Sequence, residues 1–426
     1  MKKKNNQTDR REFLQSGLLG TAAAGLTIAS AGNTYAQAPL EALEPEATNV
    51  VDVLVVGGGT AGHVAAIQAA RAGAKTLLVE RNAQLGGTST TGGVSYPGLF
   101  DAWGKQVIAG IGWELVKESV ELDGGELPDF AKVPKRHPEN QVFTNQFLYA
   151  LLAEEKCTEA GVEIAYYEFP QKVAKTDKGW TVDCVGFGTQ RQVHCKQIID
   201  CTGGAEVVGM LGFSRLREEE RQPGSYLFQI NKGNVPGQSR ANRLKRLYVH
   251  GADSTNSRTV TVANMTGRKS ILEKLRKDKA RITHLQPETG FRESYRIEGE
   301  TLITVNDYRS GRVFDDAISY AFYPVDLHTK TGVKPKPLNR GIVPTIPLSA
   351  LIPKGSKNII VAGRCVSSDR LANSGLRVQA SCMGMGQAAG VAAALAAKAG
   401  TTPLEVPLAE IQALLKEHGH IIPKKV

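Results

Sequence analysis

Apolar and polar positions along this chain follow two periods, and the first clear segment begins near residue 50. Residues 50–56 form an almost continuous β-branched run, which is typical of a strand buried on both faces of a parallel sheet. Residues 57–62 supply a glycine-rich turn, and 61–72 predicts an alanine-rich helix. Residues 75–80 predict a second strand. Together these segments indicate a β-α-β unit.

The pattern changes after this unit. Gly86 to Gly112 is rich in glycine and aromatic residues, and we expect it to be loop packed on a ligand. Two helices and four strand-like segments follow, with a hairpin signal at Asp177-Lys178-Gly179. These elements are expected at 112–122, 144–160, 162–167, 172–176, 180–185 and 190–199. The hairpin and its neighbours predict a β-meander inserted into the main sheet.

The remainder predicts a second domain and a return to the first. Residues 206–339 carry more charge and more aromatic residues, whereas a strand at 358–362 and an alanine-rich helix at 381–399 are again strongly apolar. The fold class is therefore α/β, with a central parallel sheet. The expected units are a discontinuous first domain (50–205 and 340–400), a second, substrate domain (206–339) and a helical tail (401–426).

The N-terminus resembles an export signal. Residues 1–11 are basic and polar, 13–36 carry no charge, and Ala36-Gln37-Ala38 has the form of a cleavage site. Arg10-Arg11 followed by x-Phe-Leu indicates the twin-arginine pathway, with its export machinery as a partner and the periplasm as destination. A general secretory signal or a membrane anchor is the alternative. Residues 39–49 are expected to be a tether. The twin-arginine route carries folded proteins, which suits an enzyme that acquires its cofactor before export.

The charge and the cysteines of the chain indicate which ligands and partners to expect. The formal net charge is +10, of which the residues through Ala38 contribute +3. The basic run 240–246 is interpreted as a solvated helix face, so no nucleic-acid partner is expected, but a mildly basic surface favours an anionic small-molecule substrate. The six cysteines contain no C-x-x-C, which argues against zinc or an iron–sulfur cluster. We expect no metal site, and thiols rather than disulfides.

The spacing Gly57-x-Gly59-x-x-Gly62 is weak alone but specific in its context. It follows a buried strand and opens a helix, and Glu80 ends the next strand, as in dinucleotide-binding turns. Gly57 permits the tight turn, Gly59 lets backbone N–H groups approach a pyrophosphate, and Gly62 lets helix and strand pack closely. The helix N-terminus attracts the phosphates. Glu80 can accept the hydroxyls of a ribose. The alternative is a glycine-rich turn in an unrelated sheet.

Three further glycine-bounded pieces favour FAD over NAD. Gly86-Gly87-Thr88-Ser89 follows the second strand, and Asp200-Cys201-Thr202-Gly203-Gly204 ends a distant one. Val361-Ala362-Gly363-Arg364 precedes the last long helix. A nicotinamide site needs only the first β-α-β unit, whereas a flavin also needs backbone around its ribityl chain and ring.

With these pieces the chain resembles the FAD-dependent oxidoreductase family with a glutathione-reductase-type FAD fold. The family is more distantly similar to the flavoprotein subunits of fumarate reductase and heterodisulfide reductase. The resemblance rests on Gly57–Gly62, Glu80, Leu85–Thr88, Asp200–Gly203, Arg292–Ser294, Tyr323–His328, Ala362–Arg364 and Arg377–Gly390. It implies a discontinuous FAD/NAD(P)-binding Rossmann-like domain, non-covalent FAD and redox activity, but supplies no substrate. Gly204 and His63 depart from the family pattern, since relatives often carry an acidic residue and a small or apolar residue there.

The candidate site residues follow from these motifs. His328 is the best general acid/base, because imidazole titrates near working pH, although a buried structural histidine is the alternative. Arg292, Arg296 and Arg377 could bind an anionic group or stabilise reduced flavin. For Arg292 and Arg296, pairing with a neighbouring glutamate (Glu293 or Glu298) is equally compatible. The cofactor-binding candidates are Gly57, Gly59, Thr60, Ala61, Gly62, Glu80, Arg81, Gly86, Gly87, Thr88, Thr202, Gly203, Gly363, Arg364 and Arg377.

The expected reaction is hydride transfer between a small polar substrate and N5 of the flavin, with dehydrogenation slightly favoured and His328 taking the partnered proton. Reduction of an activated C=C bond would use the same parts. A nicotinamide-dependent dehydrogenase, a non-catalytic flavin-binding protein and an electron-transfer subunit remain alternatives from other classes. The electron acceptor stays unidentified.

Overall fold

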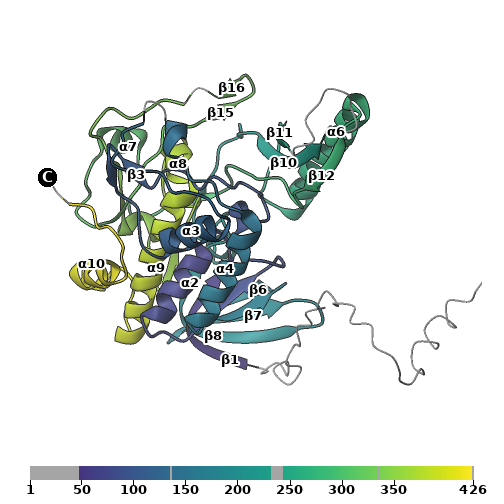
Figure 1. Ribbon diagram of the computed structural model, residues 1–426. Helices are drawn as coiled ribbons and strands as arrows, with labels where there is room; N and C mark the ends of the chain where they lie inside the picture. The colour runs from purple at the N-terminus through teal and green to yellow at the C-terminus, as the bar shows by residue number, and fades with distance from the viewer. Residues whose placement is uncertain (1–47, 135–136, 232–242, 334, 425–426) are drawn as a thin grey trace, which may run out of the picture. The chain divides into compact units, whose positions relative to one another are not determined.

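The main sheet joins strands that are far apart in the sequence. The computed structural model describes residues 48–134, 137–231, 243–333 and 335–424, and in it the sheet order is β5-β2-β1-β8-β7-β6, with β18 also paired to β8 (Figure 1). Residues 1–47, and with them the expected signal, lie outside the described residues. The strands that pair in parallel are β1 (Thr48–Val56), β2 (Thr76–Glu80), β5 (Glu163–Tyr166), β8 (Gln190–Asp200) and β18 (Ile359–Val361).

Strand β8 belongs to the parallel sheet and to the β-meander at once. Along one edge, residues 192–200 pair with β1 from Thr48 to Val56, so Thr48 and Asn49 of the expected tether are part of strand β1. Along the other edge, residues 190–195 pair antiparallel with β7 (Gly179–Val185), and residues 198–200 pair with β18. Strand β6 (Phe169–Thr176) completes the meander by pairing with β7. The inserted meander predicted from the hairpin signal is confirmed.

Helices α2 (Gly62–Arg71), α3 (Ile111–Leu122), α4 (Gln146–Glu159) and α9 (Gln379–Ala399) pack together in the largest apolar core (Figure 1). Helices α2 and α9 touch backbone to backbone, because a Cβ on Gly390 would lie 2.5 Å from the carbonyl oxygen of Ala65. Among the described helices, α9 alone is long and apolar enough to suit a membrane span, but 94% of that stretch is buried inside the protein. It therefore serves as the core helix.

The smallest of three apolar cores lies between α6 (Ser257–Asp278) and a three-stranded antiparallel sheet. The sheet order is β11 (Arg243–Val249), β10 (Gly224–Asn231) and β12 (Arg281–Leu285). The prediction of a helix face for the basic run was wrong over its described part. Residues 243–246 lie on β11, because pairing with the apolar strand β10 overrides their helical propensity. Residues 240–242 lie outside the described residues.

The region predicted as the substrate domain divides among the three apolar cores, since Val207, Val208 and Ile297 pack with residues of β1 and β8. Apolar side chains from 303–338 belong to the same core as α2 and α9. The boundaries at 206 and 339 remain a prediction. The other described elements are η2 (Gly87–Ser89), β3 (Asp101–Ala102), β4 (Lys105–Gln106), η3 (His137–Asn140), α5 (Glu206–Met210), β9 (Arg215–Leu216), β13 (Arg296–Ile297), α7 (Val305–Ser310), β14 (Ala317–Tyr320), β15 (His328–Thr329), β16 (Gly332–Val333), β17 (Thr345–Pro347), η4 (Leu348–Leu351), α8 (Arg370–Leu376) and α10 (Leu408–Glu417).

Candidate functional site

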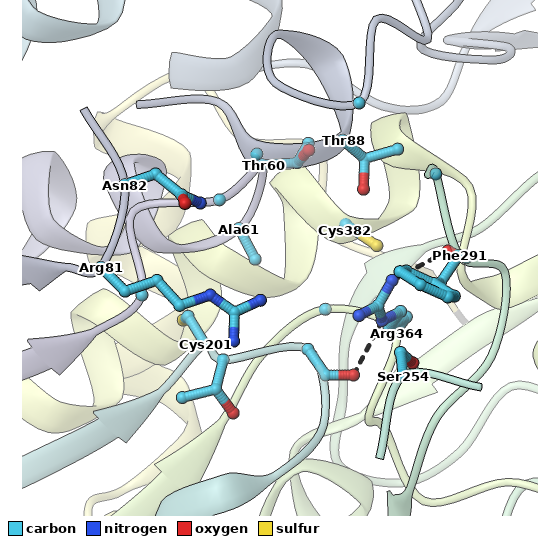
Figure 2. A pocket seen from close by; sticks show the side chains of 18 of the residues that line it. Thr60, Ala61, Arg81, Asn82, Thr88, Cys201, Ser254, Phe291, Arg364 and Cys382 are labelled. Carbon is cyan, nitrogen blue, oxygen red and sulfur yellow. Dashed lines mark hydrogen bonds between the residues drawn. The ribbon is translucent and has the colours of Figure 1, made fainter. Parts of the chain in front are cut away.

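A pocket opens at the edge where β1, β2, β8 and β18 end, because the carboxyl ends of parallel strands meet at one edge of a sheet. Figure 2 shows Arg81 and Asn82 on one side of this pocket and Arg364 and Phe291 on the other. Thirteen of the fifteen predicted cofactor residues line it: Gly57, Gly59, Thr60, Ala61, Glu80, Arg81, Gly87, Thr88, Thr202, Gly203, Gly363, Arg364 and Arg377.

Glycine is required for a different reason at each of the three positions of the first turn, Gly57, Gly59 and Gly62. Gly57 has φ +95°, a backbone conformation that L side chains rarely adopt. A Cβ on Gly62 would lie 1.8 Å from the carbonyl oxygen of Gly57, so only glycine lets α2 start this close to β1. A Cβ on Gly59 would meet no protein atom within 4 Å, although Gly59 lines the pocket. The space beside Gly59 is therefore pocket space.

Glu80 is held at the end of β2 by backbone donors. The N–H of Gly58 donates to its carboxylate at 2.6 Å, and the N–H of Asn82 donates at 2.8 Å. Burial raises the pKa of Glu80, and these two hydrogen bonds oppose that rise. The side chain still lines the pocket, where it can accept hydrogen bonds from a ligand.

The second glycine piece is fastened to the first turn. Gly86 donates its N–H to the carbonyl oxygen of Gly58, and the Thr60 hydroxyl donates to the Gly86 carbonyl at 3.1 Å. Gly86 itself has φ +99°, so the sequence requirement for glycine there is conformational. Gly62 and Gly86, the two predicted cofactor residues that do not line the pocket, thus shape the turns behind it.

The third piece is organised by a buried carboxylate and an arginine. Asp200 accepts hydrogen bonds from the backbone and hydroxyl of Thr202, and burial raises its pKa. Arg364 donates to the carbonyl oxygens of Gly203 and Phe291, both at 2.8 Å (Figure 2). Arg364 therefore ties the end of β8 to the segment that leads into the catalytic candidates.

Two of the catalytic candidates, Arg292 and Arg377, line the pocket together. Arg292 donates to the Pro223 carbonyl oxygen at 2.6 Å and to the Ser225 hydroxyl at 2.8 Å. Burial and the charge of Arg377 lower the pKa of Arg292 to about 9. Arg377 donates to the carbonyl oxygen of Asp326 at 3.2 Å, while its buried Nε has no hydrogen-bond partner among the described residues. Burial also lowers the pKa of Arg377.

His328 does not line the pocket but is connected to it through Asp326. Its Nε2 lies 3.1 Å from Oδ2 of Asp326, and the same carboxylate oxygen lies 3.8 Å from Arg377. The side-chain oxygen of Gln222 accepts from the backbone N–H of His328 at 3.0 Å. Burial lowers the pKa of His328, and the Asp326 hydrogen bond offsets part of that effect. The imidazole is therefore neutral at neutral pH.

Arg296 lies outside the pocket lining and forms an ion pair. Its guanidinium donates two hydrogen bonds to Glu218, at 2.9 and 2.7 Å, and a third to the Ser368 carbonyl. The expectation of an ion pair is met with a different partner, because the pairing of β13 with β9 brings residue 218 to Arg296. Glu293 instead pairs with Arg370 and is therefore not the ion-pair partner of its sequence neighbour Arg292.

Several lining residues escaped the sequence reasoning because no motif marks them. They are Asn82, Glu206, Ser254, Val260, Glu288, Phe291 and Gln379. Gln222 was also missed, although it contacts the backbone of His328 and the guanidinium of Arg377. His63, the departure noted in the turn, hydrogen-bonds the Gly59 carbonyl and the Tyr149 hydroxyl, and burial lowers its pKa to about 4. It therefore packs behind the turn as a neutral side chain.

The comparison with protein families decides the identity of this pocket. The family described as FAD dependent oxidoreductase matches residues 52–269 and 215–415, which together cover most of the chain. This chain belongs to the FAD-dependent oxidoreductase family. Its cofactor is FAD.

Individual relatives resemble this oxidoreductase only in part. A pseudooxynicotine dehydrogenase from a Pseudomonas species is 42% identical over 86 residues, which cover 19% of this chain and 17% of that protein. Mitochondrial dihydrolipoyl dehydrogenase from Caenorhabditis elegans is 58% identical over 41 residues, 10% of this chain and 8% of that protein. These matches span less than a fifth of either relative's length. The solved structure of OxyS anhydrotetracycline hydroxylase from Streptomyces rimosus aligns at 14% identity with a TM-score of 0.45, covering 87% of this chain and 66% of that one.

The pocket of this oxidoreductase suits FAD on its own chemistry. Beside Gly59 there is room for a pyrophosphate to approach the backbone, and Glu80 offers a carboxylate to a ribose at the same end. Arg377 also lines the pocket, and its buried Nε, which has no hydrogen-bond partner among the described residues, is a polar group suited to the edge of a flavin ring.

Proposed function

We propose that this oxidoreductase acts on a small anionic substrate, by hydride transfer with the flavin, in the direction of dehydrogenation. The observation that carries the proposal is the excess of positive charge around Arg292 and Arg377. Asp326 is the carboxylate that contacts Arg377, whereas Glu293 is engaged by Arg370 and Gln222. The lowered pKa of Arg292 reflects burial together with its cationic neighbours Arg377 and Arg246. A carboxylate ligand would neutralise this excess.

FAD, when bound, supplies the two-electron chemistry. The chain's residues then have separable tasks. Arg292 and Arg377 would hold the carboxylate of the substrate through charge-assisted hydrogen bonds and so fix its orientation. Gln222 would act as a positioning residue, because its amide oxygen accepts from both His328 and Arg377.

His328 would take the proton at a defined atom, through an intervening water because its side chain does not line the pocket. Burial would raise the pKa of Asp326, but its hydrogen bond to His328 and the charge of Arg377 lower it, so Asp326 is ionised and can only accept. The proton of the neutral imidazole therefore lies on Nε2, which faces Asp326. Nδ1 is left as the basic nitrogen, with the Asp326–His328 contact stabilising the imidazolium that forms.

Anaerobic mixing with a paired substrate panel tests the proposal. Small 2-hydroxy acids and amino acids would be compared with their methyl esters, following loss of the flavin absorbance at about 450 nm. We expect bleaching by acids and not by esters, and Arg377→Gln should raise KM for the acid by roughly tenfold or more. Arg296→Lys is the matched control, because Arg296 lies outside the pocket. Equal rates with acid and ester would refute an anionic substrate.

The alternative direction, reduction of an activated C=C bond, uses the same groups with His328 as proton donor. It predicts that unsaturated acids reoxidise photoreduced enzyme under anaerobic conditions while saturated acids fail to bleach it. A flavin-binding protein without turnover of its own predicts neither response, and an electron-transfer subunit predicts reoxidation by an electron acceptor alone.

We also propose that the protein is exported by the twin-arginine pathway to the periplasm. Support comes from Arg10 and Arg11 ahead of an uncharged, glycine- and alanine-rich stretch. Replacing both arginines by lysine should leave the folded, yellow protein inside the cell. Export that persists in this variant would indicate a general secretory signal, and recovery in the membrane fraction would indicate an uncleaved anchor.

A further inference from the structure

The positive charge of this chain is concentrated in the segment from β11 through α6 to β12. Residues 243–285 contain eleven Lys and Arg against three Asp and Glu, a formal net charge of +8, whereas the whole chain carries +10. Residues 1–38 contribute +3, so everything else together carries −1. Such an uneven distribution marks a surface that attracts an anionic partner.

Helix α6 presents this charge on the face opposite its packing face. Ala263, Gly267 and Ile271 are buried against the small sheet, and Figure 1 shows α6 lying along one face of β10–β12. Six side chains spaced by three and four residues form a line on the other side of the helix. This line, which we call the α6 stripe, consists of Arg258, Val262, Met265, Lys269, Leu272 and Arg276.

The α6 stripe contains three basic and three apolar side chains, and all six are exposed. Val262 and Met265 are each 64% exposed and Leu272 is 48% exposed. Within the described part of the chain, the basic members Arg258, Lys269 and Arg276 form no ion pair. The acidic side chain closest to the stripe in sequence is Glu273, at its margin. The described residues therefore neither pair with these charges nor bury these apolar groups.

We propose that the α6 stripe binds the surface of an anionic lipid bilayer, with the helix lying in the plane of the interface. A bilayer surface offers anionic headgroups and an apolar layer directly beneath them, which matches the mixture along the stripe. The long stems of Lys and Arg reach the headgroups while neighbouring apolar side chains enter deeper. A nucleic acid would meet the charges but leave Val262, Met265 and Leu272 in water. This inference does not depend on the proposed reaction.

Co-sedimentation of the FAD-loaded full chain with vesicles tests it. The five basic residues among the first eleven would be Gln in every variant, so that they do not contribute. Vesicles of phosphatidylcholine would be compared with vesicles containing about 30% phosphatidylglycerol, at low and high salt. We expect salt-sensitive binding to the anionic vesicles and little to the neutral ones.

Substitutions on α6 test whether the α6 stripe is the surface that binds the vesicles. Reversing Arg258, Lys269 and Arg276 to Glu should weaken binding by about a hundredfold, and replacing Val262, Met265 and Leu272 by Ser should weaken it roughly tenfold. Glu273→Lys should strengthen it. The matched control reverses three exposed lysines on the β6–β7 hairpin (Lys172, Lys175 and Lys178), which changes net charge equally.

The hairpin control shows whether vesicle binding depends on the α6 stripe or only on the net charge of the protein. The proposal holds if the hairpin variant binds the anionic vesicles as tightly as the protein with unchanged α6, and if all variants retain the same FAD content. It fails if the hairpin variant loses binding as much as the stripe variant, if neutral vesicles bind equally, or if anionic vesicles do not bind. Tighter salt-sensitive binding to a DNA duplex than to vesicles would also overturn it, in favour of a nucleic-acid surface.

Discussion

Gly59 offers a way to separate folding from cofactor binding. Its φ lies outside the left-handed region and an added Cβ meets no protein atom within 4 Å, so Gly59→Ala should fit the cofactor-free protein. Loss of chain entropy in the unfolded state should even raise the free energy of unfolding by about 0.5 kcal/mol. The new methyl group would occupy pocket space where the backbone approaches the pyrophosphate. Losing one charge-assisted hydrogen bond there costs about 1.5–3 kcal/mol, which weakens FAD binding by roughly ten- to a hundredfold.

Two measurements on the same samples check this expectation. Titration of the apoprotein with FAD, followed by quenching of flavin fluorescence, gives the dissociation constant, and thermal unfolding with and without FAD gives the linked stabilisation. Gly59→Ala should match the parent without FAD and gain less from added FAD. Gly62→Ala is the contrasting variant, because its Cβ would lie 1.8 Å from the Gly57 carbonyl oxygen and should destabilise the apoprotein by about 1–3 kcal/mol or more. If Gly59→Ala binds FAD as tightly as the parent, the turn is not the pyrophosphate cradle.

Three other residues give predictions of different kinds. Arg296→Leu should lower the free energy of unfolding by about 1–3 kcal/mol, since it breaks the pair with half-exposed Glu218, yet leave turnover of the folded enzyme unchanged. His328→Gln should remove the acid limb of kcat/KM. That limb should lie below pH 6.5, because burial lowers the pKa of His328. The free energy of unfolding should fall as the pH decreases through the same acid range, because the unfolded chain binds the proton more readily than the folded one. Gly390→Ala gains about 1 kcal/mol of helix propensity but overlaps the Ala65 carbonyl, so chemical denaturation should report a net loss of up to about 2 kcal/mol.

The parts of the fold that could be predicted are those set by local backbone requirements. Gly57 and Gly86 adopt positive φ, and Gly62 leaves no room for a side chain, so their spacing carries the turn geometry directly. The buried strand β1 and the core helix α9 are recognisable from their composition. The predicted start of each lies within two residues of the observed one.

What could not be predicted depends on contacts between distant segments. Arg296 meets Glu218 only because β13 pairs with β9, and no local pattern marks either strand. Gln222 reaches His328 across more than a hundred positions. The basic residues near 243 were assigned to a helix, because the pairing of β11 with β10 is invisible in a short window of sequence. Function-bearing side chains of this type are found only when the sheets are assembled.

The residues that line the pocket are spread through the sequence from Gly57 to Cys382, and this has a consequence for biosynthesis. A ribosome that has released β1, α2 and β2 has made only one end of the cradle. The nascent polypeptide cannot enclose a flavin ring until α9 has emerged. Messages truncated before that point should yield colourless products, so a yellow product shows that translation has passed α9.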